Sequence, residues 1–130
     1  MILLTGAAGF IGSYLVKTLL KNDFEGPHIV AVDDLNFLSE RKSCETFRDK
    51  EILFLSPEEF LKRLSDSEIH PRAVFHIGAC SNTEELRTDY LKKVNVDYSK
   101  ALWNYCLQTD TPFLYASSAA TYGDGALGFD

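Results

Sequence analysis

The sequence lacks the features that mark several broad classes of protein. It contains no run of about 18 apolar residues, the length needed to span a membrane. Its net charge of −6 is opposite in sign to that of a nucleic-acid-binding face, which neutralises phosphates with Lys and Arg. The first residues carry neither the basic start nor the cleavage site of a signal peptide. We therefore expect a cytoplasmic protein without nucleic-acid or membrane partners.

Cysteine is also scarce. Cys44, Cys80 and Cys106 cannot all pair, and their spacings match no zinc-binding pattern, so they are interpreted as reduced thiols and no metal site is expected. With 130 residues, 45% of them hydrophobic, the chain is long enough to bury a core without such crosslinks. Because no internal repeat or linker divides it, residues 1–130 are predicted to form one domain.

Continuous apolar runs predict the strands of a parallel sheet. Each run is apolar throughout rather than alternating, as expected for strands that are covered on both faces. The predicted strands are residues 2–5, 29–32, 52–55, 73–77 and 113–116. Helical patterns lie between most of them. Strands and helices in alternation, joined by right-handed crossovers, predict an α/β fold with a doubly wound parallel sheet and helices on both faces.

The helices differ in how clearly the sequence marks them. In the first, Ile11, Leu15 and Leu19 recur every four residues and are expected to form its apolar stripe. Ser56 is expected to cap a helix that begins at Pro57. A long helix is predicted over residues 84–107, whereas residues 35–50 are expected to be partly loop.

Three glycines form a loop between the first predicted strand and the first predicted helix. Gly6 allows a tight turn, Gly9 lets a pyrophosphate approach the backbone, and Gly12 lets helix and strand pack closely. The free N–H groups at the helix start then meet the phosphates at the positive end of the helix dipole. This context predicts a Rossmann-type site for a nicotinamide dinucleotide. A glycine-rich turn without a ligand is the alternative.

Two acidic residues, Asp33 and Asp34, follow the second predicted strand. Asp33 lies 21 residues beyond Gly12. An acid at this place accepts hydrogen bonds from the adenosine ribose; a polar strand end without a ligand is the alternative interpretation of Asp33. Asp34 adds negative charge where a 2′-phosphate would lie, which favours NAD. Arg41 and Lys42 could fold back onto such a phosphate, which favours NADP. The residues leave this choice open.

Small and polar residues follow the fourth predicted strand, where a ligand of such a sheet lies. Gly78 and Ala79 are small enough for the backbone to pass close to a cofactor, and Ser81 is placed to contact the nicotinamide or the substrate. An ordinary turn is the alternative. Cys80 is interpreted as a buried small residue rather than a nucleophile, because no histidine partner for it is evident nearby in sequence.

Two polar side chains lie in apolar surroundings. His76 is inside the fourth apolar run and is interpreted as a core histidine with satisfied hydrogen bonds rather than a catalytic base. Asn95 lies inside the predicted long helix. It either bonds backbone across to the fourth strand and holds the shape of the site, or is an exposed helix asparagine.

Serines follow the fifth predicted strand, and at that place Ser117 and Ser118 can hydrogen-bond a substrate hydroxyl. Together with the glycine loop, Asp33, residues 78–80 and Asn95, the run Ser117-Ser118-Ala119-Ala120-Thr121-Tyr122-Gly123 resembles the extended short-chain dehydrogenase/reductase family. The likeness covers nearly the whole chain and is weakest over residues 35–50.

The resemblance implies a nucleotide-sugar epimerase of lipopolysaccharide-core precursor synthesis, acting on an ADP-sugar. Such an enzyme oxidises one sugar carbon with a tightly held NADP or NAD and returns the hydride to the other face. It also implies a homo-oligomer at full length. Ser118 would be the catalytic serine and, with Ser81, a substrate contact. The implied cofactor contacts are Gly6, Gly9, Phe10, Ile11, Gly12, Asp33, Asp34, Lys42, Ile77, Gly78, Ala79, Cys80, Ser81 and Asn95.

The acid/base pair of that family does not occur in this sequence. The pair is a tyrosine followed four residues later by a lysine, and none of the six tyrosines has a lysine at that spacing. We therefore expect the chain to be the N-terminal part of a longer enzyme and to be unable to epimerise a sugar alone. Two other hypotheses are a UDP- or dTDP-sugar epimerase or dehydratase, and a non-catalytic dinucleotide-binding domain.

Overall fold

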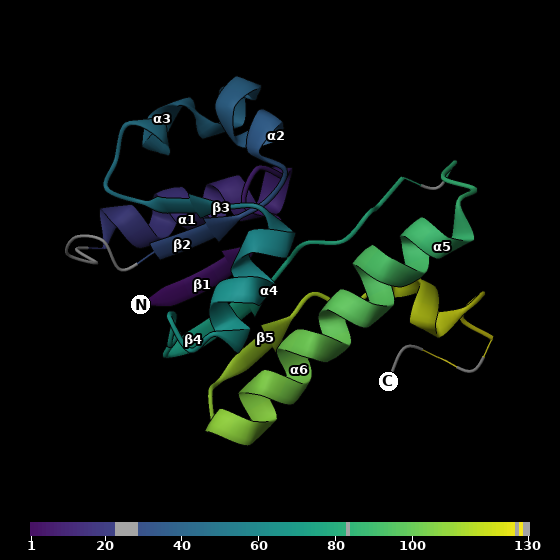
Figure 1. Ribbon diagram of the computed structural model, residues 1–130. Helices are drawn as coiled ribbons and strands as arrows, with labels where there is room; N and C mark the ends of the chain where they lie inside the picture. Colours follow the sequence, from purple (N-terminus) through teal and green to yellow (C-terminus); the bar gives the residue numbers. More distant parts are fainter. Residues whose placement is uncertain (23–28, 83, 127, 129–130) are drawn as a thin grey trace.

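A five-stranded parallel sheet is the centre of the computed structural model, which describes residues 1–22, 29–82, 84–126 and 128 (Figure 1). The strand order is β3-β2-β1-β4-β5, and every neighbouring pair is parallel. The strands are β1 (Ile2–Thr5), β2 (Ile29–Val32), β3 (Leu53–Leu55), β4 (Ala73–His76) and β5 (Phe113–Tyr115). The predicted doubly wound sheet is confirmed, with three of the strands one residue shorter than predicted.

Helices cover both faces of the sheet. On one side lie α1 (Phe10–Lys21), α2 (Leu35–Glu40), a 3₁₀ turn η1 (Lys42–Cys44) and α3 (Glu45–Arg48). On the other lie α4 (Pro57–Ser65) and a long helical segment made of α5 (Thr88–Leu91), a π-helical turn η2 (Lys92–Asp97) and α6 (Tyr98–Thr109). A second 3₁₀ turn, η3 (Ala119–Tyr122), follows β5.

Two separate cores result from this layering. Successive strand residues point to opposite faces, so Leu3 packs in the cluster under α4 and α6, while Leu4 packs in the cluster under α1 and α3. Phe60 anchors the first cluster and Phe47 the second, and both side chains are fully buried. Burial on both faces is confirmed for β1 and β2, whereas Leu53 in β3 and Leu114 and Tyr115 in β5 are exposed.

The predicted apolar stripe of the first helix is partly wrong. Ile11 is 63% exposed, and the buried positions of α1 are Gly12, Ser13 and Val16. The helix turns this side to the sheet because a side chain on Gly12 would overlap the carbonyl oxygen of Gly6. Close backbone contact at the start of the helix thus sets its rotation, and Leu15 and Leu19 pack at the margin of the core.

Helix boundaries also differ from the prediction at two places. Residues 84–87 are not helical, because Asn82 and Glu85 accept hydrogen bonds from the backbone N–H groups of Glu84 and Arg87 and compete with helical bonds. Residues 35–50 are largely helical rather than loop. The predicted cap of α4 is confirmed, since the Ser56 hydroxyl accepts a hydrogen bond from the N–H of Glu59 at 3.1 Å.

Within the described part of the chain, no helix is both long and apolar enough to cross a bilayer.

Replacing Gly12 with Ala is expected to destabilise the protein by more than the roughly 1–3 kcal/mol typical of an overpacked core. The added Cβ would overlap the Gly6 carbonyl, and backbone cannot rotate out of the way. Gly9→Ala is the matched control, because its Cβ would lie 3.2 Å from the same oxygen and its φ of −70° suits alanine. The control should stay within about 1 kcal/mol of the wild type in urea unfolding. Equal losses for the two variants would contradict this account of the loop.

Candidate functional site

The candidate site lies at the carboxyl ends of β1, β2 and β4. The sheet order changes direction at β1, whose neighbours β2 and β4 follow it along the chain on opposite sides. In open α/β sheets this is where ligands bind. Three predicted segments meet here: the glycine loop after β1, Asp33 after β2, and residues 77–81 after β4.

The glycine loop is held by backbone hydrogen bonds. The N–H of Gly6 donates to the carbonyl of Val32 at 2.9 Å, and the N–H of Gly9 donates to the carbonyl of Gly6 at 3.0 Å. Gly9 precedes α1 and offers no side chain to cap it, so the first N–H groups of this 12-residue helix face the loop without a side-chain acceptor. Phe10 at the helix start is 91% exposed. The arrangement suits an anion such as a pyrophosphate.

The loop also touches the end of β4, backbone against backbone. Gly6 has a φ of +71°, and a Cβ placed on it would lie 2.5 Å from the Cα of Gly78. A Cβ on Gly78 would in turn lie 2.7 Å from the nitrogen of Gly6. Both positions therefore require glycine, and their contact brings the first and fourth strand ends together.

Asp33 connects the end of β2 to the glycine loop. One of its carboxylate oxygens accepts a hydrogen bond from the N–H of Ala8 at 2.9 Å, and the other accepts from the N–H of Asp34 at 2.8 Å. Each oxygen retains a free lone pair for an external donor. The Asp34 side chain caps α2 by accepting from the N–H of Asn36 at 2.8 Å.

Of the two basic residues considered for a phosphate, Arg41 is the one in contact with the loop. Its guanidinium donates to the carbonyl of Ala8 at 3.3 Å and lies 3.9 Å from the ring centroid of Phe37. Ser43, which the sequence did not single out, donates to the same carbonyl at 3.3 Å. Lys42 is exposed. Nothing in the local sequence distinguishes Arg41 from its neighbour, because their difference arises from how the chain leaves α2.

The segment after β4 is held by Asn95. Its side-chain oxygen accepts from the N–H of Cys80 at 2.7 Å, and its amide nitrogen donates to the carbonyl of Cys80 at 3.1 Å. Of the two interpretations of Asn95, the one in which its side chain bonds to backbone is confirmed, because it bonds both backbone groups of Cys80 in this segment. It lies in the π-helical turn η2, and such turns are frequent at functional sites. Cys80 is half-buried, so its interpretation as a buried residue is wrong, because the segment runs at the surface beside Ala79 and Ser81.

His76 is a core histidine, as predicted. Its side chain is 1% exposed and stacks on the ring of Tyr115 at 5.5 Å between centroids. Nδ1 lies 2.6 Å from the hydroxyl of Thr5, and Nε2 lies 2.7 Å from the hydroxyl of Ser99. Burial lowers the pKa of His76 from its usual 6.5 to about 4, so the ring is neutral at neutral pH.

Ser118 lies three residues beyond β5 and is exposed. Its hydroxyl oxygen accepts from the N–H of Ala120 at 3.2 Å and so caps η3. Because β5 is parallel to the other strands, Ser118 follows the same edge of the sheet as the glycine loop. Its hydroxyl proton is free to be donated, since the cap uses only a lone pair.

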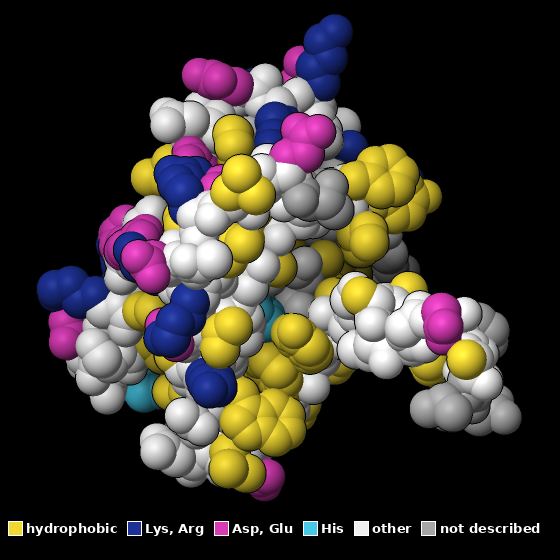
Figure 2. Space-filling view, turned by 90° about the vertical axis from the view of Figure 1, so that its right-hand side faces the viewer, with side chains coloured by type: hydrophobic (Ala, Val, Ile, Leu, Met, Phe, Trp, Pro, Cys, Tyr) yellow, Lys and Arg dark blue, Asp and Glu magenta, His cyan; other side chains and the backbone are white. Residues whose placement is uncertain are grey.

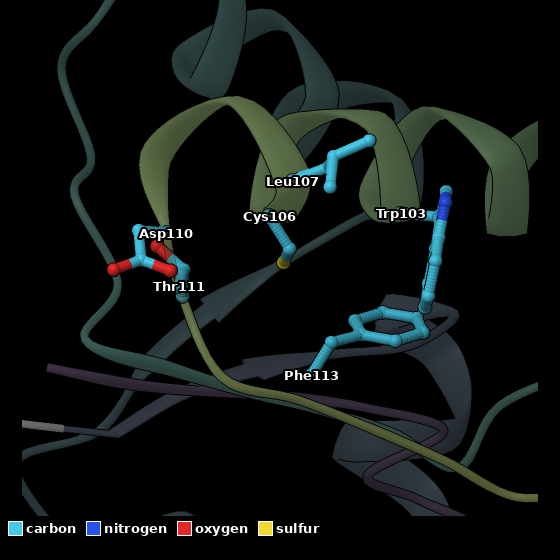
Figure 3. A pocket seen from close by; sticks show the side chains of 6 residues that line it. All are labelled: Trp103, Cys106, Leu107, Asp110, Thr111 and Phe113. Carbon is cyan, nitrogen blue, oxygen red and sulfur yellow. The ribbon is translucent and has the colours of Figure 1, made fainter.

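A pocket of about 290 Å³ lies elsewhere, between α6 and the start of β5 (Figure 3). It is lined by Trp103, Cys106, Leu107, Asp110, Thr111 and Phe113. Thr111 precedes β5, so the pocket lies toward the amino ends of the strands, away from the glycine loop. Apolar side chains also gather on the face shown in Figure 2, and Trp103, Leu107 and Tyr115 are more than half exposed. The polar side chains that line this pocket are those of Asp110 and Thr111.

Across the residues that the structure describes, no group of three or more His, Cys, Asp or Glu side chains could hold a metal ion.

Comparison with known proteins gives consistent matches. A family model described as "NAD dependent epimerase/dehydratase family" matches residues 2–128. The ADP-L-glycero-D-manno-heptose-6-epimerase of Cupriavidus pinatubonensis is 48% identical over 127 residues, which cover 95% of this chain and 36% of that protein.

Solved structures agree with this match. The ADP-L-glycero-D-manno-heptose-6-epimerase of Helicobacter pylori has a TM-score of 0.73 and 27% identity, covering 94% of this chain and 40% of that one. The UDP-glucuronic acid 4-epimerase of Bacillus cereus, solved in complex with NAD, has a TM-score of 0.73 and 25% identity, covering 95% of this chain and 41% of that one. The chain thus spans well under half the length of these relatives.

The neutral state of His76 predicts a loss of stability in mild acid. Because the pKa is lower in the folded state, the unfolded chain takes up a proton first as the pH falls. The contribution is complete above pH 6.5 and is lost between pH 6.5 and about pH 4. At about 1.4 kcal/mol per pKa unit, the loss is roughly 3 kcal/mol.

Urea unfolding across this pH range measures the effect. His76→Gln should show a shallower decline than the wild type, whereas His70→Gln, at an exposed position, should keep the wild-type slope. A His76 variant that declines as steeply as the wild type would show that the acid sensitivity comes from other groups.

Proposed function

The chain belongs to the NAD-dependent epimerase/dehydratase family, and we propose that it forms the cofactor-binding part of an ADP-L-glycero-D-manno-heptose 6-epimerase. The observation that carries the proposal is the 48% identity to an epimerase of that name over 95% of the chain, joined to a glycine loop built for a dinucleotide. The proposed enzyme acts in the cytoplasm, takes an ADP-sugar as substrate and associates with copies of itself.

The residues at the loop fit a dinucleotide. The uncapped start of α1 offers N–H groups to a pyrophosphate, and Gly9 leaves its approach free of a side chain. Gly6 and Gly12 allow the close backbone contacts that shape the loop. When bound, NAD or NADP supplies the hydride acceptor and donor of the reaction. The role of this chain is to bind and orient that group. No tyrosine in it is followed four residues later by lysine, so we do not assign it the acid/base step.

Recognition of the adenosine end is assigned to Asp33 and Arg41. The free lone pairs of the Asp33 carboxylate accept from the ribose hydroxyls. Arg41, held at the loop by Phe37 and the carbonyl of Ala8, is the group that would pair with a 2′-phosphate, in place of the exposed Lys42. The Asp34 carboxylate caps α2, so less of its negative charge is left to repel a 2′-phosphate beside Arg41. These contacts support NADP as the preferred cofactor.

The nicotinamide and substrate contacts are assigned to the ends of β4 and β5. Residues Ile77, Gly78, Ala79 and Cys80 form a backbone wall beside the loop, held in place by Asn95. Ser81 at the end of this wall and Ser118 after β5 are the proposed substrate contacts. Ser118 suits this role because its hydroxyl can donate while its oxygen caps η3.

The same geometry would also serve a UDP-sugar epimerase. The Bacillus cereus UDP-glucuronic acid 4-epimerase matches the fold with the same TM-score of 0.73. The 48% identity to the Cupriavidus heptose epimerase supports the first candidate. Among the solved structures the identities are similar, at 27% to the heptose epimerase and 25% to the UDP-sugar enzyme.

Thermal unfolding with NADP, NAD or ADP tests the dinucleotide site. A ligand at a hundredfold its dissociation constant stabilises by about 2.7 kcal/mol, which raises the unfolding midpoint by a readable amount. We expect NADP to give the largest increase and NAD a smaller one. If neither dinucleotide raises the midpoint above that with ADP, the proposed cofactor site is wrong.

Replacing Arg41 with Ala is expected to weaken NADP binding at least about tenfold, because a charged hydrogen bond to the 2′-phosphate is lost. NAD binding should change little, because NAD has no phosphate there. Lys42→Ala is the matched control, removing a neighbouring positive charge that is exposed. Isothermal titration of each variant with both dinucleotides gives the comparison. A loss of NADP affinity in the Lys42 variant instead would reverse the assignment.

A further inference from the structure

A path of hydrogen bonds, linked at one point through the covalent frame of Asn95, runs through His76 from one end of the cofactor wall to the other. It begins where the N–H of Gly78 donates to the Thr5 hydroxyl at 3.3 Å. Thr5 contacts Nδ1 of His76 at 2.6 Å, and Nε2 contacts the Ser99 hydroxyl at 2.7 Å. Ser99 donates to the carbonyl of Asn95 at 2.8 Å, and the Asn95 side chain bonds both backbone groups of Cys80, at 2.7 and 3.1 Å.

The chemistry of the two ends fixes every proton on this path. A carbonyl only accepts, so the Ser99 hydroxyl uses its proton on Asn95 and must accept from Nε2–H of His76. A neutral imidazole has one N–H, so Nδ1 is unprotonated and accepts from the Thr5 hydroxyl. The Thr5 oxygen is then left with lone pairs for the N–H of Gly78. All the donors and acceptors are satisfied by one arrangement.

We propose that His76, as the neutral Nε2–H tautomer, is a positioning residue that sets the backbone of residues 78–80 for the dinucleotide. The proposal rests on the proposed function, because it takes these residues to be the cofactor wall. Residues 77–82 form no helix or strand, so the two ends of the path supply much of what holds them. Gly78 is held through Thr5 and Cys80 through Asn95, and the imidazole of His76 joins these two sides of the path.

Packing alone does not account for a histidine here. The ring lies among those of Tyr98, Phe113 and Tyr115, with centroid distances of 5.8, 6.0 and 5.5 Å. An apolar ring would fill this space without the cost of burying two polar nitrogens. What an apolar ring cannot do is accept at one nitrogen and donate at the other, and that pair of bonds joins β1 to the helix that carries Asn95.

Two substitutions of Thr5 isolate the path from the packing. Thr5→Val keeps the shape of the side chain and removes the hydroxyl, whereas Thr5→Ser keeps the hydroxyl. We expect Thr5→Val to weaken binding of NADP or NAD about tenfold and Thr5→Ser to leave it within about twofold, since only the first leaves Nδ1 and the N–H of Gly78 unpaired. The stability of each variant is measured by urea unfolding, beside its affinity for NADP and NAD. A purely structural role would lower the stability of Thr5→Val but leave the dinucleotide affinity of its folded form unchanged, and would overturn the proposal.

Nitrogen NMR of the imidazole and hydrogen exchange of the amides decide the proposal without a ligand. The wild type should show Nε2–H and an unprotonated Nδ1, and the amides of Gly78 and Cys80 should exchange faster in Thr5→Val but not in Thr5→Ser. An Nδ1–H tautomer, or equal exchange in the two variants, would overturn it. If the wild type binds no dinucleotide, the proposed function fails, while these two readouts still decide whether His76 positions the segment.

Discussion

The contact between the backbones of Gly6 and Gly78 is the constraint on which the other parts of the site depend. It places the end of β4 against the loop after β1, at a distance that no side chain at either position would allow. The rotation of α1 depends on the same loop, because Gly12 packs on the carbonyl of Gly6. As a result, the uncapped helix start, the Asp33 carboxylate and the segment after β4 lie together at the carboxyl edge of the sheet.

Much of the fold could be predicted because burial on both faces leaves a clear pattern in sequence. The apolar runs at 2–5 and 29–32 match β1 and β2 to the residue, and the Ser56-Pro57 pair marks the start of α4. The errors arose where distant contacts outweigh local pattern. Ile11 fits a helical apolar stripe, yet the close approach of Gly12 to Gly6 turns that side of α1 outward.

The site was predictable in its residue types but not in its hydrogen-bond partners. Spacing identified the glycines and Asp33, since each lies next to a strand end, whereas the residues alone left two readings of Asn95 open. The bonds of His76 to Thr5 and Ser99 join residues 71 and 23 positions apart, and no local pattern in the chain encodes them. The choice between Arg41 and Lys42 likewise depends on the direction in which the backbone leaves α2.

The Asp33 carboxylate serves two structures at once, and this limits how cofactor preference could be redesigned. Exchanging the acid for a neutral residue is an obvious way to admit a phosphorylated ribose. In this protein it would also take away the acceptor of the Ala8 N–H, and with it one of the hydrogen bonds that tie the glycine loop to the end of β2. A designer who wishes to alter selectivity while preserving affinity would do better to vary the surface around Arg41 and Ser43, where side chains reach the loop from outside.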